Sequence, residues 1–376
     1  MLALFHAMKQ CFDTYTPWGS LTGIRPSKMV RQWLDEGLTH ENIINSMTDI
    51  YCCDKKKANL ALQVALAEIE IAKKIQGTGV YISIPFCPSR CIYCSFNMSN
   101  KLPSIDMQRQ YITCLIQEIN KTQAKNISSI YIGGGTPTVL TDHELYRLLE
   151  NICKHFNNLT EFTIEAGRPD TLTHTKLKIL KEHGITRIAI NPQTMNNLTL
   201  KSIGRNHTAE DFITAFEMAR QYNFNTINSD IIIGLPGETI LDVKNTVKRL
   251  LLLGPENITV HTLAVKRASK IHEQLSNFTF EHAKDIEKKL DLSYELITAS
   301  NQSPYYLYRQ KNMVGLFENT GFSKPGHECL YNIGMMAEVQ TIIGYGAGAV
   351  SKFIDGDKIT RKFNPKSLDH YILAWQ

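Results

Sequence analysis

Hydrophobic and polar positions follow two different patterns along the chain, and the change falls near residue 77. Before it, apolar residues recur at helical spacing, most clearly over residues 57–75, where no Gly or Pro interrupts them. We therefore predict a helical N-terminal segment over residues 1–76. After it, short apolar runs rich in β-branched residues alternate with longer helical stretches, which predicts repeated β-α units.

Six of the apolar runs are expected to be strands, with helices in the gaps between them. Successive β-α units give parallel strands with right-handed crossovers. The pattern therefore predicts an α/β fold, an open (β/α)6 partial TIM-like barrel over residues 77–268, which binds ligands at the carboxyl ends of its strands. The expected strands are 80–84, 129–132, 162–166, 187–190, 228–233 and 258–263, and the expected helices include 105–123, 142–155, 209–222 and 241–253.

The β-α repeat stops after Ser269. Residues 281–300 carry a helical pattern, and six glycines fall between residues 321 and 348 of the remainder. We expect residues 269–376 to form a smaller C-terminal cap region that covers the barrel.

The composition narrows the classes of function. Hydrophobic residues make up 43% of the chain and charged residues 20%, as in ordinary globular proteins. The net charge of +5 is too small to indicate nucleic-acid binding, although it suits an anionic ligand. No apolar run approaches the roughly 18 residues of a membrane span, and the first residues lack the basic start of a secretory signal. We expect a cytoplasmic monomer that neither binds nucleic acid nor inserts into a membrane.

Nine cysteines in irregular spacing argue against a secreted disulfide framework and favour a reducing compartment, where clustered cysteines bind metal. Three of them, Cys87, Cys91 and Cys94, form a Cys-x3-Cys-x2-Cys motif directly after the first expected strand. Three thiolates can hold three irons of a [4Fe–4S] cubane and leave the fourth iron open to a small ligand. A zinc loop is the alternative, but zinc needs a fourth protein ligand, which the adjacent sequence does not offer.

A second motif, Gly-Gly-Gly-Thr-Pro at residues 133–137, follows the second expected strand. Glycines let backbone groups approach a ligand closely. Exposed N–H and C=O groups there can bind the ammonium and carboxylate of an amino acid, while a plain tight turn is the alternative.

These motifs resemble the oxygen-independent coproporphyrinogen III oxidase family of radical S-adenosylmethionine (SAM) enzymes. The resemblance rests on Tyr-Ile-Ser-Ile-Pro-Phe-Cys at residues 81–87, the cysteine loop, Gly-Gly-Gly-Thr-Pro-Thr at 133–138 and further matches up to residue 352. The early stretch Trp-Gly-Ser-Leu-Thr-Gly-Ile-Arg-Pro-Ser-Lys at 18–28 resembles the HemZ subgroup of bacterial coproporphyrinogen dehydrogenases. More chain precedes this stretch in that subgroup, so a longer N-terminal region is expected.

The resemblance implies an oxygen-independent oxidative decarboxylation of coproporphyrinogen III to protoporphyrinogen IX in haem biosynthesis. A [4Fe–4S] cluster on Cys87, Cys91 and Cys94 would reduce SAM, and the resulting 5′-deoxyadenosyl radical would take a hydrogen atom from a propionate side chain. The implied partners are the tetrapyrrole substrate and an electron donor of the flavodoxin or ferredoxin type.

The resemblance also implies which residues contact SAM. Tyr81 would lie against the cluster-bound SAM, Gly134 would meet its methionine part, and Glu165 would hold its ribose. Val350 matches a contact near the same SAM, and Phe96 is expected to pack beside the SAM site. The positions that match a second SAM site in the better-studied branch are Tyr93, Gly135, Thr136, Gln193, Arg205, Asp230 and Ala264.

Two departures from the family pattern keep other functions open. Phe96 stands where the decarboxylating branch has a fourth cysteine, as it does in the haem-chaperone branch. At residues 331–336, Tyr-Asn-Ile-Gly-Met-Met replaces the His-Asn-x-x-Tyr-Trp haem-binding motif of the chaperones, which removes an axial imidazole. The alternatives are a radical SAM enzyme that degrades haem by methylation and ring opening, and a non-catalytic haem-binding chaperone.

The four propionates of coproporphyrinogen III call for fixed positive charge. Arg25 of the leader and Arg309 of the expected cap are candidates for a clamp, because guanidinium groups pair bidentately with carboxylates. Lys266 and Arg267 are further candidates, and a structural role is the alternative for each. His261 ends an expected strand, and the pattern leaves open whether it faces the functional rim or the core.

Overall fold

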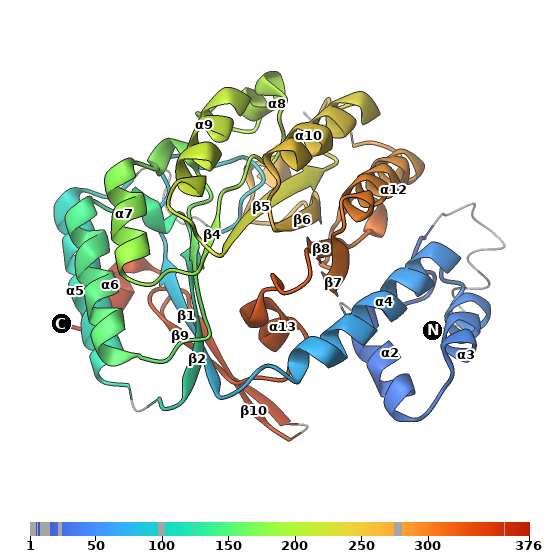
Figure 1. The fold of residues 1–376 in the computed structure, drawn as a ribbon, viewed down its shortest axis with the longest axis horizontal. Helices are drawn as coiled ribbons and strands as arrows, with labels where there is room; N and C mark the ends of the chain where they lie inside the picture. The colour runs from blue at the N-terminus through green and yellow to red at the C-terminus, as the bar shows by residue number, and fades with distance from the viewer. Residues whose placement is uncertain are drawn as a thin grey trace.

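The structure is a computed structural model that describes residues 16–21, 25–96, 102–122, 124–273, 280–356 and 358–376, together with Phe5 and Ala7. At its centre lies one 11-stranded sheet in the order β11-β10-β9-β1-β2-β3-β4-β5-β6-β8-β7. The neighbours from β9 to β6 are parallel, and two antiparallel strands extend each edge. Among the described residues β11 and β7 remain edges, so the sheet curves but stays open (Figure 1).

The six strands predicted from the sequence are confirmed, each to within two residues at either end. They are buried on both faces, as parallel strands between helices and a filled interior must be. Their bounds are β1 Thr78–Ile84, β2 Ile127–Gly134, β3 Glu161–Glu165, β4 Arg187–Ala189, β5 Thr226–Ile233 and β6 Asn257–Thr262.

The helices between these strands cover the outer face of the sheet around one aliphatic core (Figure 1). Capping boxes at Thr208 and Thr239 begin two of them, and Gly254 in a left-handed conformation ends one. Their bounds are α5 Ile105–Asn120, α6 Asp142–His155, α7 His174–Glu182, α8 Asn197–Ser202, α9 Ala209–Arg220 and α10 Ile240–Leu253. The end of the predicted helix 105–123 reaches residue 123, which lies outside the described residues.

The leader is helical from residue 26 onward, as predicted. It comprises α2 (Pro26–Asp35), α3 (His40–Asn45), a π-helical turn (Ser46–Ile50) and α4 (Lys55–Ala72). Helix α4 packs against α2 and against β7. Residues 22–24 of the leader motif and residues 1–4, 6 and 8–15 lie outside the described residues.

The chain beyond residue 269 differs from the expected cap. After α11 (Lys270–Glu273) and α12 (Ala283–Ala299), β7 (Ser303–Tyr308) and β8 (Asn319–Ser323) extend one edge of the sheet. The three last strands extend the other edge, and α14 packs on α5. Unpaired edge backbone would be exposed on both sides of a six-stranded sheet, and these strands cover it. They are β9 Ile342–Tyr345, β10 Val350–Asp355 and β11 Lys358–Phe363, and the last helix is α14 Leu368–Ala374.

Helix α13 (Leu330–Met336) lies on the concave side of the sheet, where it contacts β2, β7 and α4 (Figure 1). It is therefore the part of the C-terminal region that faces the carboxyl ends of the strands. Within the described residues, no helix combines the length and the apolar character that crossing a membrane requires.

Candidate functional site

The cysteine loop begins where β1 ends. Phe86 is fully buried with its ring edge-on to Tyr111, at 5.1 Å between ring centroids, and it anchors the start of the loop. Further along, Ile92 pairs its backbone with Ile203 and Ile271. Cys87, Cys91 and Cys94 consequently line one cavity of about 330 Å³ at the carboxyl ends of the strands.

Each of the three sulfurs lies near a hydrogen-bonding group or a cation. Cys87 Sγ is 3.4 Å from Thr136 Oγ1, Cys94 Sγ accepts from the Phe96 amide at 3.4 Å, and Cys91 Sγ is 4.0 Å from Arg168 Nη1. Burial, assisted by the other two cysteines, raises the pKa of Cys87 to about 11. Binding to iron would offset the cost of ionising a buried thiol. The three cysteines therefore fit an iron–sulfur cluster.

Across the described residues, no three acidic, histidine or cysteine side chains converge on a position where one metal ion would sit. A cubane does not require such convergence, because each of its three cysteine ligands binds a different iron. The three cysteines line one cavity, which is compatible with a cluster.

The glycine-rich loop holds the cysteine loop in place. The amides of Gly135 and Thr136 donate to the carbonyls of Ile84 and Phe86 at 2.7 Å each. A Cβ on Gly135 would lie 2.3 Å from the Phe86 carbonyl oxygen, so no side chain fits there. We expected these N–H groups to face a ligand, but two of them are used within the protein, which leaves carbonyl groups for a ligand ammonium.

Polar side chains from the end of β3, from the segment after β4 and from β5 form the floor of the cavity. Glu165 accepts a hydrogen bond from Tyr131 Oη at 2.6 Å, and burial raises the pKa of its carboxyl to about 7. Asp230 accepts from Asn191 and Asn228 at 3.2 and 3.0 Å. These oxygens can accept hydrogen bonds from the hydroxyls of a ribose.

Gln193 supplies an unsatisfied group to the same floor. Its backbone takes a left-handed conformation with φ of 66° and bridges to β5, which fixes the residue in place. The side chain is 7% exposed, and its Oε1 atom has no hydrogen-bond partner among the described residues. Since a buried acceptor without a partner is costly, the site fits a ligand that donates a hydrogen bond here.

The opposite wall is aromatic and comes from β7 and α13. Tyr306 and Tyr308 stack with ring centroids 6.3 Å apart and planes 7° apart, and both line the cavity. Asn332 and Met336 line it from α13. Between β2 and α13, the ring of Tyr131 stacks on that of Tyr331 at 4.6 Å.

His261, which the sequence left open, faces the cavity at the end of β6. Its Nε2 atom lies 3.4 Å from Asp230 Oδ2. The imidazole of His261 therefore lies beside the aromatic wall, and the carboxylate of Asp230 can orient its ring.

Most of the predicted site residues meet in this cavity. Ala264 lines an adjoining cavity of about 180 Å³ that shares part of the wall. Tyr81 and Val350 line neither; Tyr81 stacks behind Tyr131 at 6.3 Å, and Val350 begins β10. The predicted residues that line the larger cavity are Cys87, Cys91, Tyr93, Cys94, Phe96, Gly134, Gly135, Thr136, Glu165, Gln193, Arg205 and Asp230.

Arg25 and Arg309 do not line the cavity. Arg25 forms an ion pair with Glu338, and Arg309 donates to the carbonyls of Leu21 and Leu316 at 2.6 and 3.3 Å. Both side chains fasten the leader to the C-terminal region, which is the structural alternative to the clamp. Lys266 lines the adjoining cavity instead, with its ammonium 5.0 Å from the centre of the Phe96 ring.

Several lining residues were not singled out in the sequence. Asn191 and Arg168 lie just beyond strand ends, a position that could have drawn attention to them, whereas Asn228 lies within β5. Asn332 and Met336 follow no strand end. They belong to residues 331–336, which stand in place of the chaperones' haem-binding motif, and α13 reaches the cavity through packing against distant elements.

Comparisons with known proteins agree with this geometry. Residues 81–250 match the radical SAM superfamily. The chain is 40% identical to the oxygen-independent coproporphyrinogen-III oxidase-like protein HemZ of Bacillus subtilis (strain 168), over 94% of this chain and 74% of that protein. It is 33% identical to the heme chaperone HemW of the same organism, over 78% of this chain and 74% of that protein.

Among solved structures, coproporphyrinogen III oxidase (HemN) from Escherichia coli, described as a radical SAM enzyme, superimposes with a TM-score of 0.64. The match covers 82% of this chain and 71% of that chain at 21% sequence identity, so it supports the fold.

Proposed function

The chain belongs to the oxygen-independent coproporphyrinogen-III oxidase-like family of radical SAM proteins, and on that premise we propose that it decarboxylates coproporphyrinogen III to protoporphyrinogen IX. The observation that carries the proposal is the single cavity in which the cysteine loop and the polar floor face an aromatic wall. Such a wall suits the separate pyrrole rings of the tetrapyrrole, since aromatic rings pack against one another offset-stacked or edge to face.

The family uses a [4Fe–4S] cluster and SAM, which together supply the 5′-deoxyadenosyl radical that takes a hydrogen atom from the substrate. We assign Cys87, Cys91 and Cys94 as the cluster ligands, because their thiols share one wall of the cavity. Glu165 is assigned to the ribose of SAM, since its carboxyl faces the same space and is held by Tyr131.

Two cations are better placed than Arg25 and Arg309 to bind substrate carboxylates. Arg205 lines the cavity and is held by the carbonyls of Gly167 and Asn191 at 2.8 and 3.0 Å, so its charge is fixed without a carboxylate in contact among the described residues. Lys266 lines the adjoining cavity. Burial lowers its pKa from the ordinary value for lysine, and a bound carboxylate would restore it.

The test is anaerobic reconstitution with iron and sulfide, followed by turnover with SAM, a reductant and coproporphyrinogen III. We expect SAM consumption, CO2 release and protoporphyrinogen IX in constant proportion. The Lys266→Ala variant should raise KM and retain the cluster. Consumption of SAM without CO2, or the appearance of an opened ring when haem replaces the substrate, would contradict decarboxylation.

Haem binding without turnover is a second candidate, because His261 supplies an imidazole to the cavity although residues 331–336 carry no histidine. In this case His261 would bind the haem iron, and Asp230 would orient its ring. Haem titration separates the two candidates: the carrier binds one haem with a Soret shift that His261→Ala abolishes, and it releases no CO2.

A further inference from the structure

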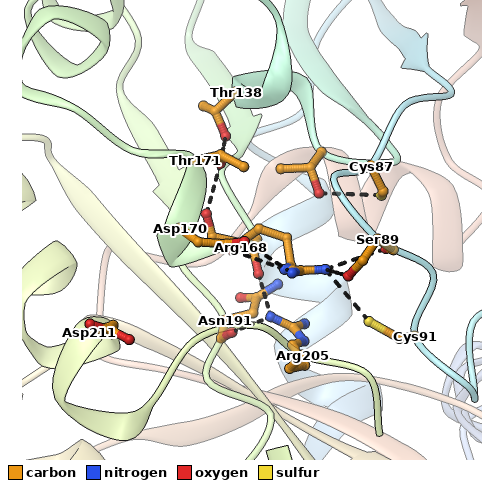
Figure 2. A network of polar contacts seen from close by, with 12 residues as sticks. Cys87, Ser89, Cys91, Thr138, Arg168, Asp170, Thr171, Asn191, Arg205 and Asp211 are labelled. Atoms are coloured by element: carbon orange, nitrogen blue, oxygen red, sulfur yellow. Dashed lines mark hydrogen bonds and ion pairs between the residues drawn. The ribbon is translucent and has the colours of Figure 1, made fainter. Parts of the chain in front are cut away.

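Arg168 reaches the cysteine loop from the turn that follows β3, and none of the functions assigned above uses it. Its side chain is 3% exposed. Nη1 donates to Ser89 Oγ at 2.9 Å and to the Ser89 carbonyl at 3.4 Å, and it lies 4.0 Å from Cys91 Sγ (Figure 2). Ser89 stands between the first two cysteines, so this contact acts on the cluster-binding segment itself.

The guanidinium is held from the other side by Asp170. Nε and Nη2 of Arg168 bind the two carboxylate oxygens of Asp170 at 3.1 Å each (Figure 2). The backbone is fixed as well, because Thr171 Oγ1 donates to the Arg168 carbonyl at 2.7 Å and also pairs with Thr138 at 2.6 Å. The charge of Arg168 therefore has one position relative to Cys91.

A fixed cation at this place acts on an electron added to a cluster. Reduction makes the cluster more negative by one charge, and a nearby buried cation stabilises the reduced form more than the oxidised form. Asp170 opposes this effect, but its side chain is a quarter exposed, so solvent screens it more than it screens Arg168. The other cations that line this region are Arg90, Arg205 and Lys266.

We propose that Arg168 is a positioning residue that holds the segment between Cys87 and Cys91 through Ser89 and raises the reduction potential of the cluster bound there. Asp170 limits the size of that increase. The inference rests on the assignment of the three cysteines and on the cluster of the family, and it is independent of the substrate.

Spectroelectrochemical titration of the reconstituted protein, without SAM or substrate, measures its reduction potential. This measurement tests the proposed electrostatic role of Arg168. Arg168→Met should lower the equilibrium constant for reduction at least tenfold, which is about 59 mV for one electron. Asp170→Asn should shift the potential in the opposite direction, and Arg168→Lys should stay close to the wild type. Arg220→Met is the matched control, because Arg220 pairs with Glu256 away from the cysteines at 2.8 Å.

Ser89→Ala tests the positioning role, since it removes the hydrogen bond from Arg168 to Ser89 Oγ, and with it the one from Ser89 Oγ to the Gly204 carbonyl, and leaves the charges unchanged. We expect slower cluster incorporation with an unaltered potential. If Arg168→Met fails to hold a cluster, the Asp170→Asn protein still decides the electrostatic role. Shifts of the same sign in Arg168→Met and Asp170→Asn, or an unchanged potential in Asp170→Asn, would overturn the electrostatic role. Normal incorporation in Ser89→Ala would overturn the positioning role.

Discussion

The two walls of the cavity differ in how the chain builds them. The cysteine loop and the glycine-rich loop come from short stretches directly after β1 and β2, and backbone hydrogen bonds join them. The aromatic wall comes from β7 and α13, which depend on packing against the leader and the far edge of the sheet. The first wall is thus specified locally, whereas the second is specified by contacts between residues hundreds of positions apart.

One buried group shows what the second wall requires. Glu318, fully buried just before β8, accepts hydrogen bonds from Trp18 Nε1 at 2.8 Å, Lys57 Nζ at 2.6 Å and Tyr294 Oη at 3.0 Å. Trp18 and Lys57 belong to the leader, so the leader motif contributes to the structure of the aromatic wall. We therefore expect that a substitution can abolish the function of one wall while the structure of the other wall stays intact.

The largest expected effect is on the locally built wall. Cys87→Ala, Cys91→Ala or Cys94→Ala should each abolish the visible iron–sulfur absorbance after reconstitution, because each thiolate holds one iron. The free energy of unfolding of the protein before reconstitution should change little. Cys153→Ala, at an exposed position on α6, is the control and should reconstitute normally. An equal requirement for Cys53 or Cys329 would refute the ligand assignment.

The next effect concerns the wall that long-range contacts build. Glu318→Gln should lower the free energy of unfolding by about 3–5 kcal/mol, because Lys57 keeps a buried charge without its partner. The double variant Lys57→Met with Glu318→Leu should regain only part of that loss, because Trp18 Nε1 still loses its acceptor. Chemical denaturation measures both values. A loss below about 1 kcal/mol in Glu318→Gln would mean that the leader does not support this wall.

The pH dependence of SAM binding tests the floor between the walls. If the ribose hydroxyls donate to Glu165, binding requires the ionised carboxylate, whose pKa is raised to about 7. The affinity for SAM should therefore fall as the pH drops below 7, by up to about tenfold per unit. The Tyr131 hydrogen bond lowers this pKa, so Tyr131→Phe should move the midpoint to higher pH.

The stability of the free protein should respond to the same carboxyl with the opposite sign. A carboxyl whose pKa is raised on folding destabilises the protein as the pH rises from its unfolded value through about 7. Glu165→Gln should consequently stabilise the free protein at pH 8 and remove the pH dependence of SAM affinity. Retention of that dependence in Glu165→Gln would assign it to another group.

The smallest effect distinguishes two roles for Arg25 and Arg309. One is the substrate clamp predicted from the sequence, and the other is the set of contacts found in the structure. Arg25→Ala should cost about 1 kcal/mol of stability, because its ion pair with Glu338 is only partly buried. The KM for coproporphyrinogen III should stay at the wild-type value, and Arg309→Ala should behave likewise. Lys266→Ala is the contrast that should raise KM. A raised KM in Arg25→Ala with unaltered stability would restore the clamp.

The sequence predicted the six central strands, the outer helices and the loops that carry the cysteines and glycines. Each of these follows from local spacing, and a strand followed by a loop places its side chains at the cavity without reference to the rest of the chain. Glu165, Gln193 and Asp230, which the family resemblance indicated, line the same cavity: Glu165 ends β3, Gln193 follows β4 and Asp230 lies within β5.

The parts that could not be predicted depend on distant partners. The strands β7 to β11 are short and complete the edges of a sheet whose centre is formed earlier in the chain. Met336 reaches the cavity because α13 packs against α4 and β7, and no local pattern carries that information. Arg25 and Arg309 were expected at a substrate because their charge was visible, while their partners Glu338 and Leu21 were not.

The most direct test of the central claim, that both walls act on one substrate, follows a labelled hydrogen atom. Coproporphyrinogen III deuterated on its propionate side chains is incubated anaerobically with the reconstituted protein, SAM and reductant, and 5′-deoxyadenosine is analysed by mass spectrometry. We expect deuterium in 5′-deoxyadenosine together with CO2 and vinyl products. Deuterium-free 5′-deoxyadenosine, with the substrate recovered intact, would contradict it.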